Sequence, residues 1–107
     1  VLGNNDIEEK KDLLKASFQF KCEIYEEPFF ISLQNKRFVI LHHPDLIEES
    51  LLLNNDFIFH GHTHRFRLEK MGNCIVFNPG ECAGIMKGKN QIGIFNLDDE
   101  EPKIINF

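Results

Sequence analysis

The sequence contains no tryptophan, a single tyrosine and only three cysteines. An odd number of cysteines excludes a complete disulfide framework, and Cys22, Cys74 and Cys82 are typical of reduced thiols in a cytosolic protein. Pairing of two of them in an oxidising compartment stays open as an alternative. No stretch approaches the roughly 18 consecutive apolar residues of a membrane span. We therefore expect a cytoplasmic protein that does not cross a membrane.

Positive charge is scarce, because 12 Lys and Arg residues stand against 17 Asp and Glu residues, for a net charge of −5. A surface that coats nucleic acid carries a basic excess, so we do not expect nucleic acid as a partner. The length of 107 residues suits one domain, and an apolar content of 42% is sufficient for a core.

The chain begins at Val1, and its only methionines are Met71 and Met86. Residues 1–6 lack the charged and apolar regions of a signal peptide and are typical of a strand end followed by a loop. We therefore expect residues 1–107 to be the C-terminal part of a single domain in a longer product.

Apolar periodicity predicts two helices, over residues 7–18 with Asp6 as N-cap and over residues 44–53. Strands are predicted from short apolar runs, and Gly72-Asn73 is a hairpin signal between two of them. The first half mixes helices and strands and the second half is nearly all strand, which predicts an α/β sandwich with helices outside the sheets. The predicted strands are residues 22–25, 29–33, 37–41, 56–60, 66–71, 74–77, 91–97 and 103–107.

All five histidines lie between positions 42 and 64. They form two groups, each directly after a predicted buried strand, where open α/β sheets place their sites. Neutral imidazole is a strong ligand for transition metals, so the grouping predicts a metal site. In an extended backbone, residues i and i+2 share a side, so we expect His62 and His64 to face one site. Adjacent residues point in opposite directions, so only one of His42 and His43 is expected to bind.

The segment Gly3-Asn4-Asn5-Asp6 also follows a short apolar stretch. An Asn carbonyl oxygen suits a cation that histidines share. The composition is equally ideal for an Asx-type turn, so both interpretations stay open here.

Taken in order, Gly3-Asn4-Asn5-Asp6, Leu41-His42-His43, Gly61-His62-Thr63-His64 and Asn78-Pro79-Gly80 resemble the motifs of the calcineurin-like metallophosphoesterases. The nearest likeness is to the small bacterial and archaeal phosphodiesterases of the YfcE type, and it covers nearly the whole chain. This resemblance implies a layered metallophosphoesterase-type β-sandwich flanked by helices, here lacking its N-terminal βαβ portion. It also implies a hydrolase with two divalent transition metals, for which Mn, Fe, Ni, Co and Zn are all candidates.

The resemblance further implies a ligand set. Asn4, His43 and His62 would bind one metal and His64 the other, with His43 preferred over His42. The family's other ligands come from an Asp-x-His pair and a Gly-Asp pair, neither of which occurs in this chain. A preceding segment is therefore expected to supply them, and the 107 residues alone are expected to be inactive.

Other positions depart from the family or support it. Asn5 stands where many members carry a His that protonates the leaving group, so no catalytic acid is assigned and Asn5 is expected to contact substrate. Arg65 is a candidate phosphate contact, with a solvated charge as the alternative. Asp6 and His42 are expected to support the ligands. Glu81 replaces the Ser that commonly follows Asn-Pro-Gly and is expected to point to solvent.

The predicted function is therefore hydrolysis of a phosphodiester or another small phosphate ester. Three alternatives remain: a catalytically inactive scaffold for protein binding on the same fold, an HNH-type nuclease, and a structural zinc site at Cys74 and Cys82. The nuclease would use His43, Asn54 or Asn55, and His64, but the acidic charge disfavours it. The zinc site lacks a second close cysteine pair.

Overall fold

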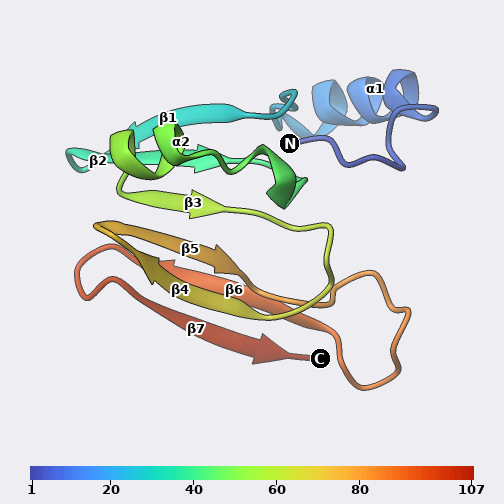
Figure 1. Cartoon of the computed structure of the whole chain (residues 1–107). Helices are drawn as coiled ribbons and strands as arrows, with labels where there is room; N and C mark the ends of the chain where they lie inside the picture. The colour runs from blue at the N-terminus through green and yellow to red at the C-terminus, as the bar shows by residue number, and fades with distance from the viewer.

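The computed structural model describes all residues from Val1 to Phe107 and consists of two β-sheets, two α-helices and one 3-10 turn, η1 (Figure 1). The larger sheet has the strand order β1-β2-β3-β5-β4. Its three central strands, β2, β3 and β5, run parallel, and the edge strands β1 and β4 run antiparallel to their neighbours. The strands are β1 (Phe29–Leu33), β2 (Lys36–Ile40), β3 (Phe57–Phe59), β4 (Arg67–Met71) and β5 (Cys74–Asn78).

This topology brings the polar segments of the sequence together. Because β2, β3 and β5 are parallel, the loops that follow them leave from the same edge of the sheet. His42 and His43 follow β2, His60 follows β3, and Glu81 follows β5 by way of a Pro-Gly turn.

One face of the larger sheet is aliphatic and packs under η1 (Pro44–Leu46) and α2 (Glu49–Asn54). Ile47, Leu51 and Leu52 contact it from above. The sequence predicted one helix over residues 44–53, but the structure divides this segment into η1 and α2. The buried residues of this face are Val39, Leu41, Ile58, Cys74 and Val76.

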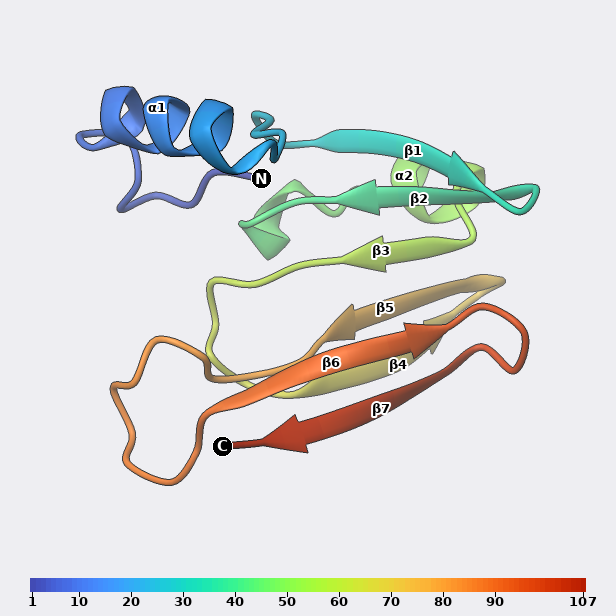
Figure 2. The same ribbon diagram turned by 180° about the vertical axis from the view of Figure 1, so that it is seen from behind.

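The opposite face is aromatic and is covered by the second sheet, β6 (Gln91–Asn96) and β7 (Glu101–Asn106), whose two strands are antiparallel. The ring centroid of Phe95 lies 5.1 Å from that of Phe57, 5.2 Å from that of Phe59 and 5.9 Å from that of Phe77. Figure 2 shows β6 passing in front of β4. The layers are therefore a two-stranded sheet, a five-stranded sheet and α2, which confirms the layered α/β sandwich.

The N-terminal region differs most from its prediction. The predicted helix is present as α1, over Lys10–Phe20 rather than residues 7–18, and it lies beside the sheets. Three of its apolar side chains are exposed, Leu14 by 45%, Phe18 by 90% and Phe20 by 73%. The helix begins after Glu9 without a side-chain cap, so Asp6 is not its N-cap, and residues 22–25 form no strand. Neither helix has the length and apolar character needed to cross a membrane.

Candidate active site

The segment after Leu2 folds into a tight turn that presents Asn4. The Asp6 N–H donates to the Gly3 carbonyl oxygen at 3.1 Å, and the Asp6 carboxylate accepts the Gly3 N–H at 2.6 Å. Gly3 is needed for close approach, since a Cβ atom there would lie 2.9 Å from His42 Cε1. The turn and the interaction of Asn4 with histidines, which the sequence left as alternatives, are both present.

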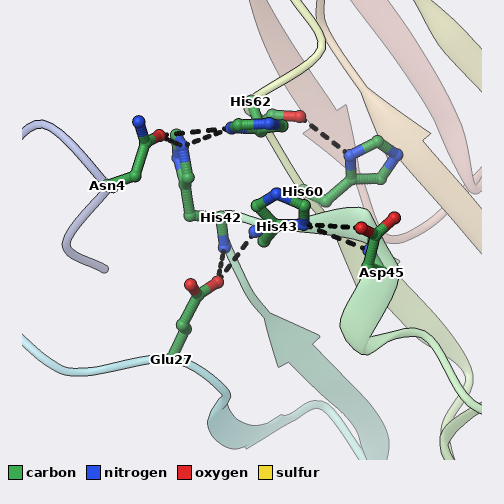
Figure 3. Close-up of polar contacts among 8 residues, drawn as sticks. Asn4, Glu27, His42, His43, Asp45, His60 and His62 are labelled. Carbon is green, nitrogen blue, oxygen red and sulfur yellow. Dashed lines mark hydrogen bonds and ion pairs between the residues drawn. The ribbon is translucent and has the colours of Figure 1, made fainter.

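The Asn4 side chain meets two imidazoles from different strand ends (Figure 3). Its Oδ1 atom lies 2.7 Å from His42 Nε2 and 3.2 Å from His62 Nδ1. The two imidazole nitrogens are themselves 3.2 Å apart. One amide oxygen and two imidazole nitrogens, from three separate segments, therefore converge at one point of the sheet edge.

Glu27 holds the loop that carries the paired histidines. Its Oε2 atom accepts the backbone N–H of His42 at 2.5 Å and that of His43 at 2.8 Å (Figure 3). The sequence analysis did not single out Glu27, because no local pattern connects it to a loop 15 residues further along the chain.

His43 points differently from His42. Its Nδ1 atom accepts the backbone N–H of Asp45 at 3.4 Å, and its ring packs against that of His62 with centroids 4.0 Å apart. The structure thus brings a ring nitrogen of His42, rather than of the preferred His43, next to Asn4 Oδ1 and His62 Nδ1. The reason is the alternation of an extended chain, in which adjacent side chains project in opposite directions.

The segment that carries His62 and His64 is not extended. Both residues have left-handed backbone conformations, with φ values of 65° and 55°. The alternation of an extended chain therefore does not apply to them: His62 contacts Asn4, whereas His64 Nδ1 lies 2.5 Å from Glu81 Oε2. That both histidines face one site stays a prediction. Non-glycine residues in this region cost on the order of 1–3 kcal/mol each and cluster at functional sites.

Glu81 is buried, being only 2% exposed, so the expectation that it points to solvent is wrong. Burial alone would raise the pKa of Glu81, but hydrogen bonds from His64 and from the N–H groups of Ile85 and Ala83 outweigh it and lower the pKa. The carboxyl group is therefore ionised near neutral pH. Nothing in its local sequence indicates burial, because its partners lie on other loops.

His60 is buried at the end of β3. It is 5% exposed, its Nδ1 lies 3.0 Å from the Gly61 carbonyl oxygen, and its Nε2 has no hydrogen-bond partner. Burial lowers the pKa of His60. Asn78 Nδ2 donates to the Gly61 carbonyl oxygen at 2.9 Å and to Thr63 Oγ1 at 3.1 Å. These two hydrogen bonds fix the loop that follows β3.

A cavity of about 600 Å³ opens beside His62. Arg65 lines it and is exposed without an ion pair, whereas Arg67 pairs with Glu69 at 2.7 Å. Asn5, the other candidate for substrate contact, does not line it and accepts a hydrogen bond from Asn4 Nδ2 at 3.0 Å. The lining residues are Pro44, His60, His62, Thr63, Arg65, Phe66 and Arg67.

Comparison with known proteins decides the family. Residues 1–100 match the calcineurin-like phosphoesterase superfamily domain. The chain belongs to this superfamily. It is 31% identical over 104 residues to phosphodiesterase MJ0936 of Methanocaldococcus jannaschii, covering 92% of this chain and 61% of that protein. The structure of an archaeal phosphodiesterase superposes with a TM-score of 0.81 at 29% identity, over 98% of this chain and 66% of the other. The chain thus spans less than two thirds of either relative.

Calcineurin-like phosphoesterases are generally dinuclear metal enzymes, and the converging donors suit a cation. Their separations of 2.7–3.2 Å are near the roughly 3 Å between neighbouring ligands around an octahedral cation with bonds of ~2.1 Å. Burial and the neighbouring His62 lower the pKa of His42, which favours the neutral imidazole that ligation needs. No three His, Cys, Asp or Glu side chains of residues 1–107 form a cluster for a metal, so this group supplies two imidazoles and one carboxamide.

The geometry does not support the nuclease or zinc alternatives. The Asn54 and Asn55 amides donate to the carbonyl oxygens of Ser50 and Leu51 and so belong to the end of α2. Cys74 is buried in the aliphatic core, whereas Cys82 is exposed, and both are free thiols.

Proposed function

We propose that this chain is the larger part of a metal-dependent phosphodiesterase. In this proposal Asn4, His42 and His62 bind one divalent metal, and His64 binds the other. The observation that carries it is the convergence of Asn4 Oδ1, His42 Nε2 and His62 Nδ1 within 3.2 Å of one another in a calcineurin-like phosphoesterase chain. His42 replaces His43 in the ligand set because only the His42 ring reaches Asn4.

The remaining ligands are proposed to come from residues outside this chain. The chain spans 61% of the length of MJ0936, and the ligand set within it is incomplete for two cations. Residues 1–107 alone are therefore expected to lack activity. The donors present are nitrogen and amide oxygen, which suit Mn, Fe, Ni, Co or Zn.

Bound divalent metals supply a water of lowered pKa and neutralise charge on the phosphoryl oxygens. The chain's own residues provide the frame for that chemistry. Glu27 and Asp6 hold the loops that present His42 and Asn4. Arg65, on the wall of the cavity beside His62, is proposed to contact the phosphate of a small phosphate ester. Bound metals and Arg65 would act on the substrate as local positive charges. The net charge of −5 of the whole chain therefore does not exclude an anionic substrate.

The test is hydrolysis of bis(p-nitrophenyl) phosphate by the complete protein in which this chain occurs. We expect turnover with Mn²⁺, loss of turnover after chelation, and loss of turnover in His62→Ala with the fold retained. Glu49→Gln is the matched control, because Glu49 is exposed on α2, does not line the cavity and is not a proposed ligand. Metal binding without turnover, together with metal-independent capture of a protein partner, would favour the inactive scaffold instead.

A further inference from the structure

The pair formed by Glu81 and His64 has no role in the convergence of Asn4, His42 and His62. We propose that Glu81 is a positioning residue, which holds His64 in the tautomer that carries its proton on Nδ1 and leaves Nε2 free to bind a metal. This inference rests on the proposed function, because His64 is a ligand only in that proposal.

The Glu81 carboxylate is fixed before it reaches His64. Its Oε1 atom accepts the backbone N–H of Ala83 at 2.7 Å and that of Ile85 at 3.3 Å. The Glu81 carbonyl oxygen also accepts the Gln91 N–H at 2.7 Å, at the start of β6. With the side chain 97% buried, since its exposed fraction is 3%, only Oε2 remains for another partner.

That remaining oxygen lies 2.5 Å from His64 Nδ1. An ionised carboxylate has no proton to donate, so the proton of this hydrogen bond belongs to the imidazole Nδ1. His64 Nε2 makes no hydrogen bond, and the His64 side chain is 38% exposed. A carboxylate that orients a histidine through one ring nitrogen while the other binds a cation is a recurrent arrangement in metal sites.

A simpler role for the pair would be to tie the loop after β3 to the loop after β5. The substitution Glu81→Gln distinguishes the two roles. The N–H groups of Ala83 and Ile85 still require an acceptor, so the Gln carbonyl oxygen must occupy the position of Oε1. The Gln NH₂ group then faces His64 Nδ1, which must accept, and the imidazole proton moves to Nε2. All hydrogen bonds are kept, so a tie between loops survives while the free Nε2 is lost.

The experiment uses the complete protein in its metal-free form, labelled with ¹⁵N, and reads the His64 tautomer from its imidazole ¹⁵N chemical shifts. We expect Nδ1–H in the wild type and Nε2–H in Glu81→Gln. Calorimetric titration with Mn²⁺ alone should show an affinity about 10–100-fold weaker in Glu81→Gln. Glu69→Gln, a change of the same chemistry on the exposed β4 surface, should alter neither measurement.

A Glu81→Gln protein that keeps the Nδ1 proton on His64 and binds Mn²⁺ as the wild type does overturns the proposal. If this variant does not fold, the metal-free wild type decides, because an Nε2–H tautomer there overturns the proposal and an Nδ1–H tautomer supports it. A wild type with the Nδ1–H tautomer but no phosphodiester turnover contradicts the proposed function alone. An active wild type and an unaffected Glu81→Gln variant contradict the positioning role alone.

Discussion

The Nε2 atom of His42 lies 2.7 Å from the Oδ1 atom of Asn4, although the two residues are 38 positions apart in the chain. Their contact joins the N-terminal turn to the end of β2, at the sheet edge where His62 also arrives. The ring of the next residue, His43, packs against the ring of His62 and does not reach Asn4.

This difference gives the first prediction. In the complete protein, His42→Ala should lower the affinity for Mn²⁺ and phosphodiester turnover by at least about 100-fold, because it removes a proposed ligand. His43→Ala should lower them by less than about 10-fold, because it removes only a packing neighbour of His62. Calorimetry and initial rates measure both effects. The opposite order of the two variants would restore His43 as the ligand.

Arg65 gives the second prediction. Arg65→Ala should raise the KM for a phosphodiester severalfold and leave the free energy of unfolding unchanged to about 0.5 kcal/mol, because the exposed side chain makes no ion pair. Steady-state kinetics and urea unfolding of the same samples check this. Lys87→Ala, at an exposed lysine outside the cavity, is the control. An unchanged KM would show that Arg65 is a solvated surface charge.

Asp56 gives a prediction of pH dependence that does not involve the candidate site. Its Oδ2 atom accepts the Arg37 N–H at 2.8 Å, and this bond, with the Arg37 side chain, lowers the pKa of Asp56. Because the pKa in the folded state is below the unfolded value of 3.8, the stabilisation is fully present above pH ~4 and is lost as the pH falls through the folded-state pKa. Asp56→Asn should therefore cost about 1 kcal/mol at pH 7 and progressively less below pH 4. Urea unfolding of the wild type and the variant at pH 7 and below pH 4 measures the cost at each pH. An equal cost at the two pH values would show that the Asp56 charge does not stabilise the fold.

Gly93 gives a prediction about how the two sheets pack. A Cβ atom at this position would lie 2.5 Å from Phe77 Cζ and 3.1 Å from Pro79 Cβ. Gly93→Ala should therefore push β6 away from the aromatic face and lower the free energy of unfolding by about 1–3 kcal/mol. Ile94→Ala, at a half-exposed neighbour in the same strand, should cost less than about 1 kcal/mol and serves as the control. Equal costs in thermal or urea unfolding would mean that β6 does not pack closely at Gly93.

Local sequence pattern was sufficient to predict most strands of the larger sheet. The apolar runs around Phe38 and Phe57 became β2 and β3, and the Gly72-Asn73 hairpin joins β4 to β5. These elements follow from alternation and turn chemistry, which act within a few residues. The same reasoning identified the apolar spacing of α1, in which Phe18 is 90% exposed. Periodicity identifies a helical face, but not what covers it.

By itself, the sequence determined that histidines gather after two core strands and that an Asn-bearing turn stands near the N-terminus. The tertiary structure decided that His42 rather than His43 meets Asn4, and that His64 Nδ1 meets a buried Glu81. The physical reason is that side-chain direction beyond a strand end depends on loop dihedral angles, such as the positive φ of His62 and His64, and on partners far away in the chain. Neither quantity is encoded in a short window of residues.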